Sequence, residues 1–355
     1  MELALYGEGG FYSTGAVAGR RGHFLTSPGV GTLFAAVLAG ALDSWWAEVG
    51  QPDPFVVVEV GAGVGTLAAG IRRASPECSP ALRYVLVERS SALRDQQARH
   101  LTLEVPSSLL RAGGEADEDD NDPDPSAGTG PMFTSLADLP GEPFTGVVLA
   151  NELVDNMAFV LLQRAESGWS EVRVGEERAD LVEVLVPASA ALANEADRLA
   201  PGAPPGARIP LQHRARTWLR DTHAKVDRGR VVLVDYASTT PALASRPWEE
   251  WLRTYRAHGR GGHPLSAPGE QDVTCEVAVD QLATVDRPSE DRSQADFLRF
   301  HGLEERVDEA RATWRERAGV GDLEALRARS LVGEAEALTE PAGLGAFRVL
   351  EWDLR

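Results

Sequence analysis

The segment from Pro54 to Ile71, PFVVVEVGAGVGTLAAGI, constrains the fold of this chain more than any other stretch. It opens with an apolar, β-branched run from Phe55 to Val60 that only Glu59 interrupts, as in a strand buried on both faces of a parallel sheet. Closely spaced glycines follow, and then come the residues Thr66 to Ala69, which favour a helix. A buried strand, a tight turn and a helix in this order predict an α/β protein.

The same alternation of strands and helices continues along the chain. Three alternating segments between Phe159 and Val186 resemble antiparallel strands, and Gly333 to Leu354 is interpreted as a terminal β-hairpin. We therefore predict an α/β fold with a mostly parallel, doubly wound sheet, inserted segments and a C-terminal antiparallel hairpin. The remaining expected elements are strands at Arg83–Glu88, Gly146–Ala150 and Arg230–Tyr236, and helices at Thr32–Val49, Gln212–Val226 and most of Arg292–Arg329.

We expect the 355 residues to form one elaborated domain in four segments. These are an N-terminal segment (1–50), a core with an antiparallel insertion near 159–210 (51–238), an inserted and largely helical region (239–328), and the C-terminal hairpin (329–355). An acidic, low-complexity stretch from Gly114 to Pro131 is expected to be a solvated loop, because it holds too little apolar surface to pack.

The charge of the chain argues against nucleic-acid binding. It has 35 Lys and Arg against 54 Asp and Glu, a formal net charge of −19, and such a surface repels nucleic acid. No apolar run reaches the roughly 18 residues of a membrane-spanning helix, and the first residues lack the pattern of a signal peptide. Cys78 and Cys275 are too few for a disulfide framework. We expect a cytoplasmic protein without membrane insertion.

The spacing of the glycines distinguishes two classes of ligand. A dinucleotide site requires G-x-G-x-x-G or a final Ala, but Thr66 occupies the third position here and Gly65 comes one residue early. The pattern E-x-G-x-G-x-G instead matches the first motif of S-adenosylmethionine methyltransferases, in which Glu59 would place negative charge near a cationic sulfonium. A turn that binds no ligand is the alternative. The candidate cofactor-binding residues are Glu59, Gly61, Ala62, Gly63, Gly65 and Thr66.

Glu88 ends the second expected strand, 23 residues after Gly65. A carboxylate in this place can accept hydrogen bonds from both ribose hydroxyls of the cofactor. A solvated acid at a strand end would look the same. We assign Glu88 and its neighbour Arg89 to the cofactor site, together with Asn151 at the end of a later strand.

Glu152 and Asp155 follow Asn151 at the carboxyl end of the sheet, where open α/β folds place their ligands. Two carboxylates can hold a guanidinium bidentately and offset its charge, so both are candidate catalytic residues for a guanidinium acceptor. An acid pair that caps a helix, with Asp155 as the cap, is the alternative. Asp235 and Tyr236 occupy the equivalent place after the next strand.

A metal site is not favoured by the sequence. His258 and His263 are the only two histidines that lie close together, and no third ligand has a convincing spacing. A serine hydrolase of the G-x-S-x-G type has no support either.

Several segments together resemble the MidA family of S-adenosylmethionine-dependent methyltransferases. They include YGEGGFYSTG, GHFLTSP, VEVGAGVGTLAAGI, VLVERS, ANELVDNMAFV and GEQDVTCEV. The family includes a mitochondrial assembly factor that methylates an arginine of a respiratory complex I subunit. The resemblance implies a Rossmann-like methyltransferase fold, S-adenosylmethionine as cofactor and a protein substrate. It also implies that residues 1–50 cover the cofactor site and that GHFLTSP lines it.

The chain departs from the family pattern in two motifs: two acids are replaced in the first, and two further residues differ in the second. His23 and Gly29 replace an Asp and a Glu, and Asn156 and Ala158 stand where the family has Ala and Pro. Methylation of a protein arginine is the leading hypothesis. There are three alternatives: a methyltransferase for a small molecule or peptide natural product, an assembly factor with little turnover, and a nicotinamide dehydrogenase. A homo-oligomeric state is compatible with the sequence.

Overall fold

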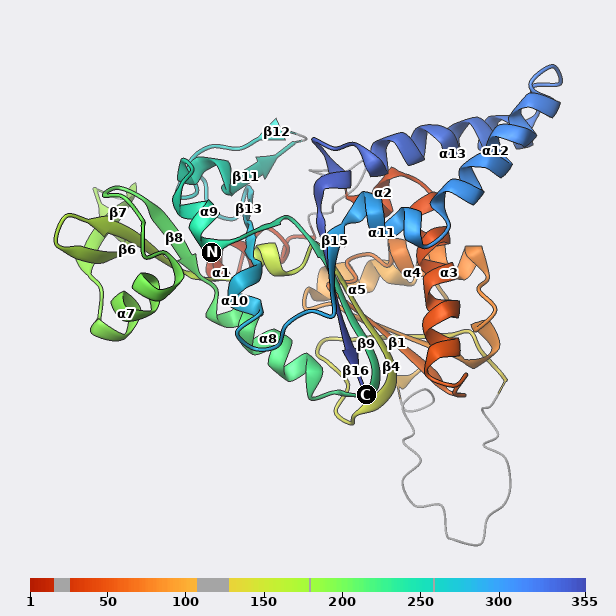
Figure 1. Ribbon diagram of the computed structural model, residues 1–355, viewed down its shortest axis with the longest axis horizontal. Helices are drawn as coiled ribbons and strands as arrows, with labels where there is room; N and C mark the ends of the chain where they lie inside the picture. Colours follow the sequence, from red (N-terminus) through yellow and green to blue (C-terminus); the bar gives the residue numbers. More distant parts are fainter. Residues whose placement is uncertain (16–25, 107–127, 179, 258) are drawn as a thin grey trace, which may run out of the picture. The chain divides into compact units, whose positions relative to one another are not determined.

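The computed structural model describes residues 1–15, 26–106, 128–178, 180–257 and 259–355 (Figure 1). The chain forms two compact units, which we call the core unit and the insert unit. The core unit comprises Val17–Asn151, Thr222–Val234 and Ser289–Arg355, and the insert unit comprises Met1–Ala16, Glu152–Asp221 and Asp235–Pro288. This division differs from the four segments expected from the sequence, whose roles stay predictions.

A seven-stranded sheet organises the core unit, in the order β15-β16-β9-β4-β1-β2-β3. The five strands from β9 to β3 pair in parallel, and β15 pairs with β16 in the antiparallel direction. The α/β prediction with a mostly parallel sheet is thereby confirmed. The strands are β1 (Phe55–Val60), β2 (Leu82–Val87), β3 (Met132–Leu136), β4 (Phe144–Asn151), β9 (Val226–Asp235), β15 (Glu290–Ser293) and β16 (Arg348–Leu354).

The order of the strands fixes where a ligand can bind. The chain runs outward from β1 to β2 and β3 on one side, and to β4 and β9 on the other, so the topological switch point lies between β1 and β4. Val60 is in register with both Val87 and Ala150, and the carboxyl ends of these strands therefore lie side by side. Ligands of open α/β sheets bind outside such strand ends at the switch point.

The helices of the core unit belong to two groups. One group precedes or follows the strands along the chain, and the other forms a long helical pair, α12 and α13, whose connecting turn lies far from the sheet (Figure 1). The helices are α2 (Ser27–Val30), α3 (Leu33–Glu48), α4 (Thr66–Ala74), η1 (Ser79–Ala81), α5 (Ser91–Gln97), α11 (Gln294–Phe300), α12 (Leu303–Arg317), α13 (Leu323–Thr339) and η4 (Leu344–Ala346).

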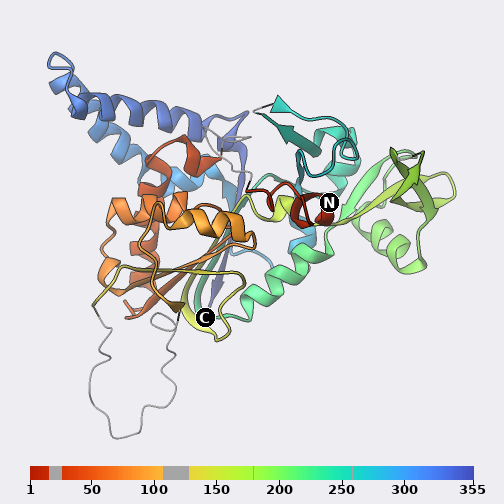
Figure 2. The ribbon, with the colours of Figure 1, turned by 180° about the vertical axis from the view of Figure 1, so that it is seen from behind.

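The insert unit contains a four-stranded antiparallel sheet, β7-β6-β5-β8, and two smaller sheets, β12-β11-β13 and β10-β14 (Figure 2). Helix α7 covers the four-stranded sheet through a cluster that includes Leu162, Trp169 and Ala196. The antiparallel strands expected between Phe159 and Val186 are confirmed as β5 to β7.

The elements of the insert unit are short. They are α1 (Glu2–Tyr6), η2 (Val154–Asn156), β5 (Val160–Ala165), β6 (Gly168–Glu177), β7 (Asp180–Pro187), α7 (Ala190–Leu199), β8 (Arg208–Leu211), α8 (His213–His223), β10 (Ala237–Ser238), α9 (Thr240–Ala244), η3 (Trp248–Glu250), β11 (Leu252–Arg256), β12 (Gly259–Arg260), β13 (Asp272–Cys275), β14 (Val277–Ala278) and α10 (Val279–Leu282). Helix α8 and strand β9 each cross from one unit to the other.

The C-terminal hairpin expected at Gly333–Leu354 is wrong. Residues up to Thr339 belong to helix α13, and the final strand β16 pairs with β15, which precedes it by more than fifty residues in the chain. Gly333 does not end the helix, because it lies exposed on α13 and keeps the helical backbone. A solvated loop was expected from Gly114 to Pro131, and residues 114–127 of this stretch lie outside the described residues.

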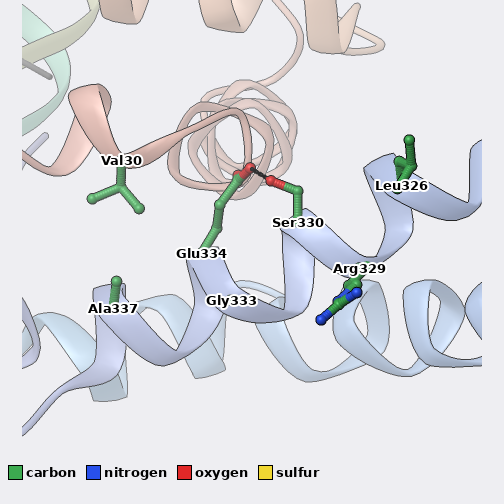
Figure 3. A pocket seen from close by; sticks show the side chains of 7 residues that line it. All are labelled: Val30, Leu326, Arg329, Ser330, Gly333, Glu334 and Ala337. Carbon is green, nitrogen blue, oxygen red and sulfur yellow. Dashed lines mark hydrogen bonds between the residues drawn. The ribbon is translucent and has the colours of Figure 1, made fainter. Parts of the chain in front are cut away.

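Glu334 ties the helical pair to the rest of the core unit. In Figure 3 the side chains of Glu334 and Ser330 rise from α13 and meet at a hydrogen bond. Glu334 Oε2 also accepts the backbone N–H groups of Thr32 and Leu33 at 2.7 and 2.9 Å, at the start of α3. A carboxylate in this place satisfies N–H groups that have no partner within the helix and interacts favourably with the helix dipole.

We predict that Glu334→Ala lowers the free energy of unfolding by about 1–2 kcal/mol, because it removes this cap from a sixteen-residue helix. Glu336→Ala is the matched control, since Glu336 is exposed two positions along the same helix, and it should change stability by less than about 0.5 kcal/mol. Urea denaturation measures both. Equal midpoints for the two variants would contradict the capping role.

Candidate functional site

The glycine loop leaves β1 in a conformation that favours glycine at three positions. Gly61, Gly63 and Gly65 have φ angles of 77°, 52° and 82°, in the left-handed region that L side chains rarely adopt. The N–H groups of Gly61 and Ala62 both donate to the carbonyl of Val87, at 2.9 and 3.1 Å, and so bind the loop to the end of β2. The glycines therefore occupy the three positions at which the turn requires a positive φ angle.

The three glycines face different surroundings. A Cβ built on Gly65 would lie 3.1 Å from the side chain of Leu86, so this glycine permits close packing. A Cβ on Gly63 would meet nothing within 4 Å. Gly63 therefore faces open space, and a ligand could approach its backbone there. Helix α4 begins directly afterwards at Thr66, which is exposed, and its first N–H groups point toward the helix start.

Two buried side chains hold the peptide groups of Gly63. Glu88 Oε2 accepts the N–H of Gly63 at 3.0 Å, and Gln97 Nε2 donates to the carbonyl of Gly63 at 2.8 Å. Glu88 is 7% exposed and Gln97 is fully buried. Sequence reasoning missed Gln97, because within SALRDQQ it resembles any polar residue of a solvated helix.

Glu88 keeps the capacity to bind a diol. Its other oxygen accepts the N–H of Ser90 at 2.7 Å, and the backbone N–H of Arg89 also interacts with the carboxylate, whose two oxygens can together accept about four hydrogen bonds. Burial raises the pKa of Glu88, while the N–H groups of Ser90 and Gly63 oppose the rise. A carboxylate held in this way fits the two ribose hydroxyls of an adenosine group.

Glu59 connects the sheet to helix α4. It is buried, accepts the Tyr84 hydroxyl at 2.8 Å, and receives the backbone N–H of Ala68 in the first turn of α4. Burial raises the pKa of Glu59 to about 8, so the group is mostly protonated at neutral pH. Glu59 thus fastens α4 to the sheet, and the negative charge expected from it beside a sulfonium stays a prediction.

The other expected cofactor residues lie at the same edge of the sheet. Arg89 is exposed, and its carbonyl, like that of Glu88, accepts a hydrogen bond from Arg94. Asn151 is the last residue of β4, in register with Val234 of β9. Their contacts with a cofactor, and those of the loop residues, stay predictions.

The acid pair of the sequence analysis belongs to the insert unit, where it joins two further acids. Glu152 has a φ of 51°, a left-handed backbone that is rare outside glycine and occurs preferentially at functional sites. Asp235 Oδ2 accepts the N–H groups of Val154 and Asp155, at 2.9 and 3.1 Å. The cap of the turn η2 is therefore Asp235, and the alternative in which Asp155 is the cap is wrong.

Asp272, on β13, is an acid that the sequence analysis did not use. Its Oδ1 accepts Asn156 Nδ2 at 3.1 Å, and Asn156 Oδ1 accepts the Tyr12 hydroxyl at 3.2 Å. These three side chains come from distant segments, 116 and 144 residues apart, and no local pattern connects them. Two signals were available: Asn156 stands where the resembling family has Ala, and Asp272 lies within GEQDVTCEV, one of the segments that carry the resemblance.

The carboxylates of Asp155, Asp235 and Asp272 are buried, with exposures of 2%, 1% and 0%. Burial raises the pKa of Asp235 and of Asp272 to about 7. The pKa of Asp155 lies well above its ordinary value, first because of burial and then because of the negative charges of Asp235, Asp272 and Glu152. We call these three aspartates the buried acid cluster.

No metal centre emerges from the described part of the chain, in which no group of three or more His, Cys, Asp or Glu could hold an ion. His263 lies 3.6 Å from Glu183, while His258 and His23 fall outside the described residues. Within the same ranges, every helix is too short or too polar to cross a membrane.

Comparisons with known proteins identify relatives. Residues 37–295 match a family described as "Putative S-adenosyl-L-methionine-dependent methyltransferase". The chain is 27% identical over 290 residues to the mitochondrial protein arginine methyltransferase NDUFAF7 homolog of Drosophila melanogaster, covering 76% of this chain and 61% of that protein. It is 27% identical over 318 residues to NDUFAF7 of Bos taurus, named in the same way, covering 84% and 67%.

A solved structure from Burkholderia thailandensis, bound to S-adenosyl-homocysteine, matches the fold with a TM-score of 0.78. The two chains are 26% identical, and the match covers 99% of this chain and 86% of that one. The resemblance noted from the sequence, the Rossmann-like fold and the choice of cofactor are confirmed by these comparisons.

We predict that Gly63→Ala weakens S-adenosylhomocysteine binding at least tenfold, about 1.4 kcal/mol, because the new methyl group enters the space open to the ligand. Gly321→Ala is the matched control: Gly321 also has a positive φ, of 67°, and its Cβ would also meet nothing within 4 Å. Both variants should lose about 1 kcal/mol of stability through backbone strain. Calorimetry should show full affinity in the control only. Unchanged affinity in folded Gly63→Ala would contradict the placement of the ligand.

We predict that the free energy of unfolding falls less steeply with rising pH in Glu59→Gln than in the wild type. The folded state keeps a proton on Glu59 up to pH about 8, whereas the unfolded state releases it near pH 4.5. Between these values, Glu59 should make the free energy of unfolding fall by up to about 1.4 kcal/mol per pH unit, and the neutral glutamine should not. Urea denaturation of both proteins at pH 5, 6.5 and 8 measures the difference. Parallel curves would show that Glu59 ionises normally.

Proposed function

The chain belongs to this family of S-adenosylmethionine-dependent methyltransferases, and from that premise we propose that its methyl acceptor is an arginine side chain of a protein. The curated relatives carry the name protein arginine methyltransferase, which supports this class of acceptor. A respiratory complex I subunit, implied by the family resemblance, is a candidate partner. The cytoplasmic location and a homo-oligomeric state remain predictions.

One observation carries the proposal. Glu152 and Asp155 follow β4 in the chain, and Asp155 Oδ1 is buried without a hydrogen-bond partner in the described structure. A buried carboxylate is costly unless it is protonated or paired with a cation. A guanidinium is such a cation, and its N–H groups match carboxylates in geometry as well as in charge.

The roles of the residues follow from this chemistry. When bound, S-adenosylmethionine supplies a methyl group on a positively charged sulfur, and Glu88 and the Gly63 backbone, which are joined by a hydrogen bond, would hold its adenosine end. Glu152 and Asp155 would hold the guanidinium so that one nitrogen faces the methyl group, and orientation of this kind contributes much of the rate. As that nitrogen forms its bond to carbon, it loses one proton.

Asp155 is suited to receive that proton at Oδ1. Its raised pKa keeps the proton bound when no cation is near, and a cationic acceptor favours the ionised carboxylate. The proton lost by the nitrogen therefore has an acceptor within the same site. The methylated guanidinium remains a cation, so the charge of the acceptor side chain is the same before and after transfer.

The direct test is to incubate the protein with methyl-labelled S-adenosylmethionine and host lysate, followed by mass spectrometry of peptides and small molecules. We expect label on an arginine nitrogen of one or a few proteins. Label on a small molecule, or on another side chain, would overturn the arginine assignment while leaving the methyltransferase family intact.

We predict that Glu152→Gln cuts this labelling by roughly 10²-fold or more, because it removes the charge that holds the acceptor. Affinity for S-adenosylhomocysteine should change by less than about twofold, since Glu152 does not belong to the cofactor loop. Glu166→Gln is the matched control, because Glu166 is exposed in the turn between β5 and β6. Full labelling by Glu152→Gln would show that this acid is structural.

A further inference from the structure

The buried acid cluster contains two carboxylates that each keep one free oxygen. Asp155 Oδ1 and Asp272 Oδ2 are buried and have no hydrogen-bond partner in the described part of the chain. The two side chains interact electrostatically, because the charge of Asp272 is among the causes that raise the pKa of Asp155. Unpaired buried oxygens are rare in folded proteins and call for an explanation.

The third carboxylate of the cluster is different. Asp235 Oδ2 accepts the N–H groups of Val154 and Asp155, and its Oδ1 accepts the N–H of Tyr236 at 2.8 Å. Both oxygens are therefore used by the backbone. Asp235 holds the turn η2 in place and leaves the free acceptor capacity to Asp155 and Asp272.

Asn156 determines which oxygen of Asp272 is free. Asn156 Nδ2 donates to Asp272 Oδ1 at 3.1 Å and to the carbonyl of Val273 at 3.0 Å, and the N–H of Val273 donates to the same Oδ1 at 2.9 Å. Oδ1 is thus saturated and fixed. Oδ2 has no partner at hydrogen-bond geometry in the described part of the chain, although the Tyr12 hydroxyl lies close enough to the carboxylate to oppose the rise of its pKa.

Cations are missing around the cluster, and aromatic rings are present. No Lys, Arg or His of the described residues forms an ion pair with any of the three aspartates. Tyr12 and Tyr236 both lie close enough for the charge of Asp155 to raise their pKa. Tyrosine faces attract cations, so the surroundings favour a positively charged group with N–H donors.

We propose that Asp272 forms part of the acceptor site, where its free oxygen and that of Asp155 together receive the guanidinium of the substrate arginine. This inference rests on the proposed function and adds a residue from β13 to it. Asn156 acts as a positioning residue, because it holds Asp272 with one oxygen free. Glu152 is partly exposed, and its charge acts on Asp155.

The test uses ethylguanidinium, the charged end of an arginine side chain, and ethylurea as its neutral counterpart, with the full chain saturated by S-adenosylhomocysteine. Calorimetry should detect millimolar binding of ethylguanidinium and none of ethylurea. Asp272→Asn, which preserves shape, should weaken ethylguanidinium binding at least tenfold, and arginine labelling in lysate should fall in parallel. Asp221→Asn, at an exposed position of α8, is the control and should bind as the wild type does.

Asn156 is tested by selectivity. Asn156→Ala should lower the preference for ethylguanidinium over ethylammonium, because two fixed oxygens match the paired N–H groups of a guanidinium better than a single ammonium. A loss of stability alone would leave that ratio unchanged. If Asp272→Asn does not fold, Asp155→Asn replaces it, with the same expected loss of ethylguanidinium binding.

The outcomes separate this inference from the proposed function. Wild-type affinity and labelling in folded Asp272→Asn would overturn the role of Asp272, while loss of labelling in Glu152→Gln would still support arginine methylation. Failure of the wild type to bind ethylguanidinium would also overturn the inference. The arginine assignment itself is judged separately, by the position of the label in lysate proteins.

Discussion

The hydrogen bonds to the peptide groups of Gly63 are the interactions on which the cofactor site depends. Glu88 at the end of β2 holds the N–H, and Gln97 at the end of α5 holds the carbonyl. A glycine with a positive φ has many alternative conformations, and these two buried partners select one of them. The loop is therefore fixed before any ligand arrives, which reduces the conformational entropy lost on binding.

Burial of acids is the second theme of the structure. Glu59 is buried beneath α4 with a hydroxyl and an N–H as partners, and its burial raises its pKa to about 8. Asp155 and Asp272 are buried as well, but each keeps an oxygen without a partner. Acids of the first kind fasten elements together, whereas acids of the second kind favour a cation. That difference supports our proposal of a guanidinium acceptor.

The sequence predicted what local patterns determine. The strand Phe55–Val60, the glycine turn and the following helix are confirmed, because each depends on neighbouring residues. Long-range partners could not be predicted: Glu334 caps a helix 302 residues earlier, and Asn156 meets Asp272 across 116 residues. The terminal hairpin was wrong because the partner of β16 is β15, more than fifty residues earlier, and no local pattern indicates that pairing.

A crystal structure of the complex with S-adenosylhomocysteine tests the central claim most directly, through the distances from the Glu88 carboxylate to the ribose hydroxyl oxygens. We predict that both hydroxyls lie within hydrogen-bonding distance, roughly 2.5–3.0 Å, while the N–H of Gly63 keeps its bond to Oε2. A ligand whose ribose lies away from Glu88, or a loop that must rearrange to admit it, would contradict the account.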